Sequence, residues 1–139
     1  MNKLDDGADG VVPGARFRLD ALPAGTAEAR ALVRSFLARH APGVPEQTTV
    51  DVLLVVSELV TNAVRHAGGV TGFRVSAGAG VVEIAVRDAS PALPAPVPER
   101  RREEWLPGGY GWPLVHRLSE VTVTLLGDGG KLIQALVRH

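Results

Sequence analysis

The sequence predicts a two-layer α+β sandwich, in which a mixed or antiparallel sheet carries helices on one face. Two observations predict it. The chain contains segments with apolar residues at helical spacing, which predict helices, and short segments in which apolar and polar residues alternate, which predict strands. Their order is one strand, two helices, two strands, a long loop, a short helix and two strands, which implies such a sheet. At 139 residues, the chain fits one domain with a substantial core.

The composition excludes several classes of protein. Hydrophobic residues make up 45 % of the chain, charged residues make up 22 %, and the formal net charge is zero, so the basic surface used in nucleic-acid binding is missing. There is no cysteine, and the four histidines show no zinc-ligand spacing. No apolar run approaches the ~18 residues of a membrane span, and the N-terminus lacks a signal-peptide pattern. We therefore expect a cytoplasmic protein that binds neither nucleic acid nor membrane.

The N-terminal third is predicted to contain a tail, a strand and a helix. Residues 1–13 are polar and rich in glycine, so we expect a disordered tail followed by a domain over residues 14–139. Apolar residues alternate with charged ones over residues 15–20, as in a half-buried strand. A helix is expected from about Ala24 to Arg39, with Thr26 available as its N-cap, and it ends before the Pro- and Gly-containing segment 41–45.

A second helix is expected from about Pro45 to Ala67, where Gly68-Gly69 ends it. Its apolar residues gather on one side and a polar stripe lies almost opposite. The predicted buried side comprises Leu53, Val56, Ser57, Val60 and Val64, and the polar stripe comprises Asp51, Glu58, Asn62 and Arg65.

The rest of the chain reads as two hairpins separated by a loop and a helix. Strands at 73–77 and 82–86 flank a Gly78-Ala79-Gly80 turn. The Pro-rich, charged segment from Ser90 to Pro107 is long for a loop inside a compact domain, and such loops are usually functional or disordered. Gly108-Gly109-Tyr110-Gly111 opens a short helix that runs through Leu118. A final hairpin places strands at 121–125 and 132–137 around the turn at 127–130.

Glu58 and Asn62 are the most informative pair, because residues four apart share one face of a helix. A glutamate there can act as a general base, and the asparagine oxygen suits Mg2+, which takes few protein ligands. The alternative is that both are ordinary solvated residues of an amphipathic helix. The pair alone does not decide between these two interpretations.

Two further candidate binding motifs follow along the chain. Asp88 ends a strand, where a carboxylate can accept a hydrogen bond from the amine of adenine, although an aspartate that starts a turn is the commoner case. Gly108-Gly109-Tyr110-Gly111 precedes a helix, where glycines allow close backbone approach and helix-start amides favour phosphate. Its alternative is a flexible hinge that closes the long loop. The dinucleotide-binding fingerprint is not met, because its third glycine and preceding parallel strand are missing.

In their order and structural context, these three motifs resemble the N-box, G1 box and G2 box of the GHKL superfamily. This superfamily contains the ATPases related to gyrase, the heat-shock chaperone and histidine kinases. Glu58-x-x-Thr61-Asn62-Ala63-x-x-His66-Ala67 is most similar to the N-box of the anti-sigma-factor serine/threonine kinases and of the actinobacterial ATP-binding proteins like them. The resemblance covers roughly residues 15 to 138. It implies the Bergerat-type ATP-binding fold, with ATP and Mg2+ as cofactors.

The resemblance also implies roles for individual residues. Glu58 would be the catalytic base that deprotonates a serine or threonine hydroxyl or water, and Asn62 would hold the Mg2+ that bridges the ATP phosphates. Asp88 would bind the adenine amine. Ser90–Pro107 would form the ATP lid. The remaining residues implied in ATP binding are Arg65 and His66, near ribose or phosphate, and Gly109 and Gly111, through their backbone amides.

The chain departs from the family pattern in two places. The G1 box normally has a glycine two residues after the aspartate, where this chain has Ser90-Pro91, and proline fixes φ and removes an amide. Trp112-Pro113 follows Gly111 where the family usually shows a small apolar pair. Tyr110 or Trp112 would cover the pocket or pack in the core, and packing is favoured for Trp112. Nucleotide affinity is affected by these changes more than the fold.

The resemblance implies a regulatory protein kinase that acts on an anti-sigma-factor antagonist, sequesters a sigma factor, or does both. Members of that family commonly form homodimers, so a homodimer is implied too, although no residue identifies its interface. The first alternative is a catalytically inactive module that uses the same fold to hold a protein partner. The second is an unrelated α+β domain in which the order of the motifs is coincidence.

Overall fold

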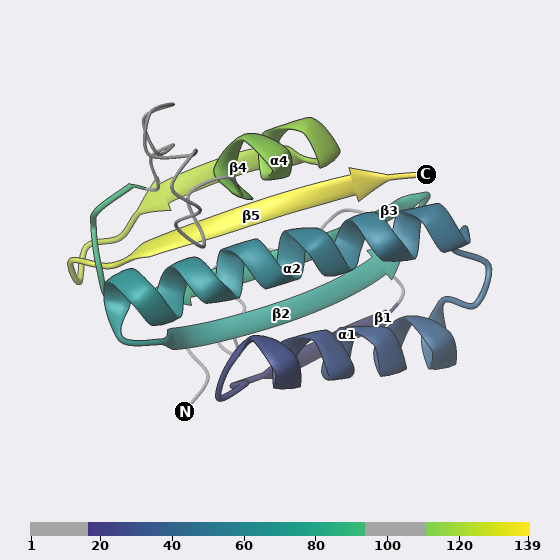
Figure 1. Cartoon of the computed structure of the whole chain (residues 1–139), viewed down its shortest axis with the longest axis horizontal. Helices are drawn as coiled ribbons and strands as arrows, with labels where there is room; N and C mark the ends of the chain where they lie inside the picture. Colours follow the sequence, from purple (N-terminus) through teal and green to yellow (C-terminus); the bar gives the residue numbers. More distant parts are fainter. Residues whose placement is uncertain (1–16, 94–110) are drawn as a thin grey trace, which may run out of the picture.

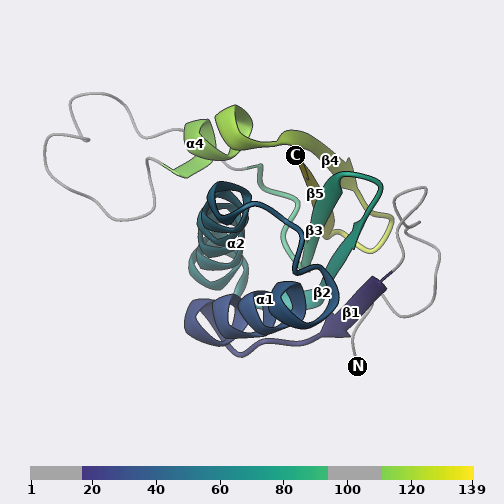
Figure 2. The same cartoon turned by 90° about the vertical axis from the view of Figure 1, so that its right-hand side faces the viewer.

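The computed structural model describes residues 17–93 and 111–139, and these form an antiparallel five-stranded sheet in the order β1-β2-β3-β5-β4. The predicted two-layer sandwich is confirmed, because α1 and α2 lie side by side on one face of the sheet (Figures 1 and 2). In chain order the elements are β1 (Phe17–Ala21), α1 (Thr26–His40), α2 (Glu46–Ala67), β2 (Val70–Gly78), β3 (Val81–Asp88), α4 (Gly111–Leu118), β4 (Glu120–Leu125) and β5 (Lys131–Arg138). This is the predicted order of elements.

The core lies between α2 and the sheet, and α2 supplies much of it. Strand residues on the helix side alternate with residues that point to the opposite face, so every second position of β2, β3 and β5 is buried against the helices. This core includes Val52, Val56, Leu59 and Val60 from α2, and Phe73, Val75, Ile84, Val86, Ile133 and Val137 from the sheet. The α2 helix is therefore fixed along its length, together with any polar side chain that it carries.

In addition to apolar packing, hydrogen bonds made by two residues of α1 join it to α2. Arg30 of α1 donates from Nη1 to the Ser57 hydroxyl (2.5 Å) and to the Leu53 carbonyl (3.1 Å). The hydroxyls of Thr26 and Thr61 are 2.9 Å apart. The prediction that Thr26 caps α1 is therefore wrong: Gly25 is the N-cap and makes no side-chain capping bond, and the Thr26 hydroxyl is taken up by α2 instead.

The buried face of α2 is shorter than predicted. Leu53, Val56 and Val60 are buried as expected, but Val64 is 44 % exposed. The first residue of α1, Thr26, already lies beside Thr61, so α1 does not extend far enough to cover Val64. The last turn of α2 is consequently open to solvent on this side.

Gly68 ends α2 in the predicted way. It adopts the left-handed conformation with φ of 75°, and the next amide, that of Gly69, donates to the Ala63 carbonyl at 3.0 Å. This turn brings β2 directly back along the sheet, with Val70 paired to Asp88 of β3. The C-terminal end of α2 and the end of β3 therefore belong to the same end of the molecule.

The face of the sheet away from α1 and α2 carries a buried ion pair. Arg74 of β2 and Glu83 of β3 are 3.0 Å apart (Nε to Oε1) and are 0 % and 2 % exposed. Ser76 and Gln134 also donate to Glu83, at 3.3 Å each. The Arg74 Nη1 and Nη2 atoms are buried, and neither has a hydrogen-bond partner in the described part of the chain. Breaking this pair would leave an uncompensated charge in the interior.

Candidate functional site

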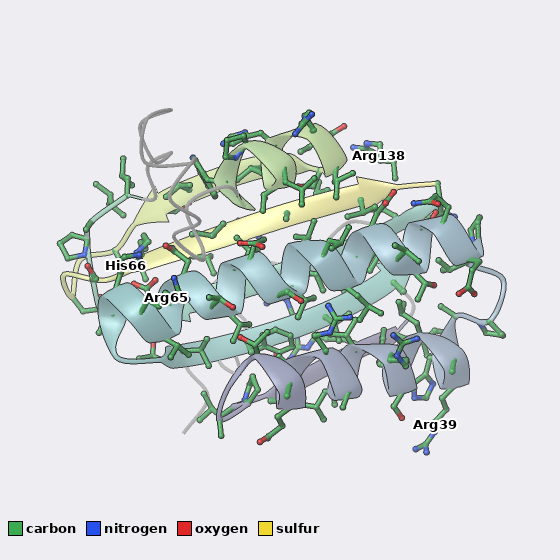
Figure 3. All side chains as sticks on the ribbon, in the orientation of Figure 1. Arg39, Arg65, His66 and Arg138 are labelled. Carbon is green, nitrogen blue, oxygen red and sulfur yellow. The ribbon has the colours of Figure 1, made fainter. Side chains whose placement is uncertain are left out.

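Two elements that meet at one end of the sheet supply five of the predicted site residues. These are Glu58, Asn62, Arg65, His66 and Asp88. The last two turns of α2 carry Asn62, Arg65 and His66, and β3 ends at Asp88. Figure 3 shows Arg65 and His66 at this end of α2. Both side chains are exposed, which leaves them accessible to a ligand.

Glu58 lies against the first residue of α4. A Cβ atom built on Gly111 would fall 1.7 Å from Oε2 of Glu58 and 2.0 Å from its Cδ. A side chain at this position would displace the Glu58 carboxylate from where it lies. The structure thus brings together Glu58 from the N-box and Gly111 from the glycine motif, which are 53 positions apart in the sequence.

The environment of Glu58 favours its protonated form. Partial burial raises the pKa of the Glu58 carboxyl above the ordinary value of 4.5, and the positive charge of Arg65 opposes this increase. A glutamate with a raised pKa is a stronger base once ionised, which suits proton transfer near neutral pH. Arg65, predicted near ribose or phosphate, therefore also acts on the charge state of Glu58.

Asn62 follows Glu58 by one helical turn and is half-buried on α2. Its carboxamide oxygen is a suitable ligand for Mg2+, which normally keeps several waters and binds few protein groups. Within residues 17–93 and 111–139, no cluster of three or more His, Asp or Glu side chains could hold a metal ion. Asn62 is the residue of the predicted site on α2 whose side chain could hold a magnesium ion.

Asp88 is placed at the end of β3 as predicted, but its carboxylate is already paired. Lys131, the first residue of β5, approaches Asp88 through Nζ at 2.9 Å from Oδ2 and 3.0 Å from Oδ1. The two side chains are 2 % and 1 % exposed. The backbone amide of Ser90 donates to the same Oδ1 at 2.9 Å, and Lys131 also donates to the Ser90 carbonyl at 3.2 Å.

Lys131 is the site residue that our sequence analysis missed. It is one of two lysines in the chain and begins a strand of otherwise apolar and uncharged residues up to Val137. Its partner became evident only from the register of the sheet, in which Asp88 lies directly opposite Lys131. Gly130 permits this register, since a Cβ there would come within 2.3 Å of the Asp88 carbonyl.

Several predictions fall on residues that the structure does not describe. The tail 1–13, Gly108, Gly109, Tyr110 and the segment 94–107 of the proposed lid lie outside the described residues. Of that lid, Ser90–Leu93 is described, and the Ser90 hydroxyl accepts from the Ala92 amide at 3.1 Å.

Trp112 is partly buried against the core, as favoured for it, and meets the His116 ring edge-on at 4.6 Å.

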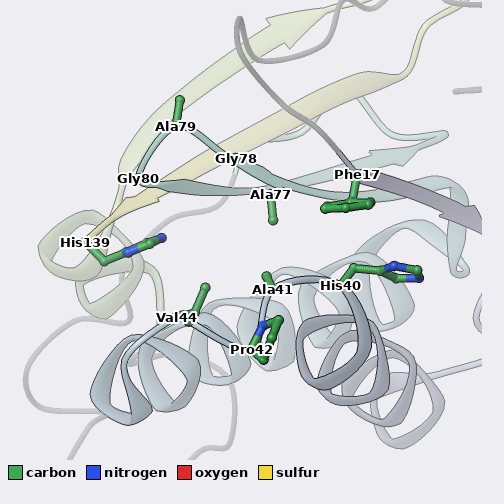
Figure 4. A pocket seen from close by; sticks show the side chains of 11 residues that line it. Phe17, His40, Ala41, Pro42, Val44, Ala77, Gly78, Ala79, Gly80 and His139 are labelled. Carbon is green, nitrogen blue, oxygen red and sulfur yellow. The ribbon is translucent and has the colours of Figure 1, made fainter.

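A cavity of about 390 Å3 lies at the opposite end of the sheet (Figure 4). It is lined by Phe17, His40, the segment 41–44, the β2–β3 turn and the C-terminal His139. None of the predicted site residues that the structure describes contributes to it. Phe17 stacks on His40 with ring centroids 5.1 Å apart, which accounts for His40 as a packing residue.

Comparison with known proteins gives the same assignment as the motifs. Residues 19–136 match the histidine kinase-like ATPase domain. Among solved structures, the fold is similar to a chain in the crystal structure of the SiaB–SiaC complex from Pseudomonas aeruginosa. The TM-score is 0.60 at 15 % identity, and the match covers 88 % of this chain and 89 % of that chain.

No curated protein sequence is similar enough to match. None of the helices in the described part of the chain is long and apolar enough to cross a membrane. The match over residues 19–136 includes every described residue of the site, from Glu58 on α2 to Lys131 on β5. The chain belongs to the histidine kinase-like ATPase family.

Proposed function

We propose that this chain is an ATP-binding regulatory protein that phosphorylates a serine or threonine of an anti-sigma-factor antagonist, acts as an anti-sigma factor, or does both. The observation that carries the proposal is the close contact between the Glu58 carboxylate and Gly111. The Glu58 carboxyl has a raised pKa and lies beside the first residue of α4, one helical turn from Asn62, which supports a role for it as the base. Such an arrangement supports proton transfer beside bound phosphates.

The residues have distinct tasks in this proposal. Glu58 accepts the proton of the attacking hydroxyl, and the backbone at Gly111 allows phosphate oxygens to approach the start of α4. Asn62 holds Mg2+, which supplies charge neutralisation when bound. Arg65 and His66, both exposed, add positive or hydrogen-bonding groups at the same end of α2. Phosphoryl transfer needs mainly positioning and electrostatic stabilisation, and these groups supply both.

A protein partner is supported by the structural similarity. The similar chain was crystallised in the SiaB–SiaC complex, that is, together with another protein. The likeness covers nearly the whole fold of both chains. A homodimer stays a prediction, for which sedimentation velocity of the purified protein is the direct test.

The second candidate function is a protein-binding module without catalytic activity. It is favoured by the state of Asp88, whose carboxylate is buried and bound by Lys131, and by Pro91, which removes a backbone amide next to the predicted base site. In this alternative the fold is kept as a scaffold and nucleotide binding is weak or absent.

Calorimetric titration with ATP, with and without Mg2+, distinguishes the two functions. We expect binding that depends on magnesium and is lost in Asn62→Ala. Gln47→Ala is the matched control, because it removes an exposed carboxamide from the first turn of the same helix. No binding at millimolar ATP would overturn the kinase proposal and support the scaffold.

Phosphate transfer from labelled ATP to candidate antagonists tests the base. We expect Glu58→Gln to abolish transfer and keep the fold, while Glu46→Gln, an exposed glutamate of the same helix, keeps transfer. Full transfer by Glu58→Gln would show that Glu58 is not the base.

A further inference from the structure

We propose that Lys131 controls base recognition in the nucleotide site, by occupying the carboxylate of Asp88 that an adenine amine would need. This inference rests on the proposed function, because it concerns the same site. It starts from a conflict in the structure: the residue expected to read the base is one of the least accessible carboxylates in the described chain, at 2 % exposure.

The Asp88 carboxylate has little hydrogen-bonding capacity left for a ligand. A carboxylate has about four acceptor positions, and an ammonium group has three donors. Oδ1 of Asp88 accepts two hydrogen bonds, from Lys131 Nζ and from the Ser90 amide, and Oδ2 lies 2.9 Å from the same Nζ in an ion pair. Lys131 donates to Asp88 Oδ1 and to the Ser90 carbonyl, and its charge also faces Asp88 Oδ2.

The neighbouring backbone keeps this pair in place. Asp88 and Lys131 are directly opposite in the β3–β5 ladder, and both side chains lie on the helix-covered face. Gly130 brings β5 so close to Asp88 that no Cβ fits between them. The pair is therefore built into the sheet and does not depend on a movable surface side chain.

The consequence is weak discrimination between bases. An adenine amine that binds a free carboxylate forms a charge-assisted hydrogen bond. Here the charge of Asp88 is already compensated by Lys131, and an incoming amine must compete with it. We expect the wild-type protein to bind ATP and ITP, which carries an oxygen in place of the amine, with similar affinity.

Replacing the ammonium group should restore recognition of adenine. Lys131→Met keeps the length of the side chain and frees Asp88, so ATP affinity should rise by about 10- to 100-fold while ITP affinity stays constant. Lys131→Gln, which still donates to Asp88 without a charge, is the second variant and is used if the methionine variant is unfolded by circular dichroism. Adding Asp88→Ala to the Lys131→Met variant should cancel the increase in ATP affinity and leave ITP affinity unchanged.

The measurement is calorimetric titration of each variant with ATP and ITP. Selectivity for ATP that appears in Lys131→Met or Lys131→Gln and disappears with Asp88→Ala supports the inference. A merely structural ion pair would change stability and leave the ATP-to-ITP ratio at its wild-type value, which would overturn it. Strong ATP selectivity already in the wild type would overturn it as well. No nucleotide binding by any folded variant would instead overturn the proposed function itself.

Discussion

The Glu58 carboxylate of α2 fills the space that a side chain at Gly111 of α4 would need. These residues lie on different helices that pack against each other, and each belongs to a separate sequence motif. The absence of a side chain at Gly111 is therefore a requirement of the Glu58 position and adds to any role of its amide.

Replacing Gly111 by alanine should displace Glu58 or the start of α4. We expect a loss of about 1–3 kcal/mol in the free energy of unfolding from overpacking and a fall of about 100-fold in phosphate transfer from misplacement of the base. Urea unfolding and a transfer assay measure the two effects. Gly43→Ala is the control, since a Cβ there meets nothing within 4 Å. Equal behaviour of the two variants would contradict the close contact.

The raised pKa of Glu58 gives a prediction for stability against pH. A carboxyl whose folded pKa lies above its unfolded value contributes stability that is fully present below the ordinary value of 4.5 and is lost as pH rises through the folded pKa. Relative to Glu58→Gln, the wild type should therefore become less stable with rising pH across this window. Urea unfolding of both proteins from about pH 4 to about pH 8 measures the difference. A difference that stays constant or reverses sign would contradict the partial burial of this carboxyl.

Activity should show the matching pH dependence. The base works only when ionised, so transfer should fall as pH drops through the raised pKa of Glu58. Arg65→Gln removes the charge that opposes the increase, and we expect it to move this fall in activity to higher pH. A profile that is unchanged in Arg65→Gln would show that Arg65 does not act on Glu58.

The Arg74–Glu83 pair should be far more important to stability than an exposed pair. Glu83→Ala leaves Arg74 buried without its charge partner and should cost about 3–5 kcal/mol. Glu120→Ala breaks the pair with Arg138, whose side chains are 61 % and 60 % exposed, and should cost far less because solvent screens these charges. Urea unfolding compares them. Similar losses would mean that Arg74 finds solvent or another partner when Glu83 is removed.

The β2–β3 turn contains a strained residue. Ala79 has φ of 54°, a left-handed conformation that disfavours a side chain. Ala79→Gly should raise the free energy of unfolding by up to about 1 kcal/mol, after the entropy cost of glycine in the unfolded chain is included. Ala31→Gly, at an exposed position inside α1, should instead lower it by about 1 kcal/mol. Thermal unfolding distinguishes the two signs.

The features that follow from local sequence pattern were predictable. Alternation and helical spacing gave the element order, and Gly68 marked the end of α2, because a left-handed C-cap depends on the residue itself. Thr26 shows the limit of such reasoning. It has the right chemistry for a cap, but the Thr61 hydroxyl, 35 residues away, takes up its side chain.

The same limit applies to the site. Glu58 and Asn62 share a face of one helix, so their proximity is a local property. The Asp88–Lys131 pair requires the register between β3 and β5, which no local pattern fixes. Val64 likewise has the spacing of a buried residue, and its exposure depends on where α1 begins.

The strand order has a consequence for how the chain folds. β2–β3 and β4–β5 are hairpins closed by short turns, whereas β1 must pair with β2 across both long helices, with Phe17 opposite Ala77. Short loops close at lower entropic cost than long ones. We therefore expect the hairpins to form early and the β1 strand to dock late, after α1 and α2 have packed, which makes this edge the last part of the sheet to become protected from hydrogen exchange.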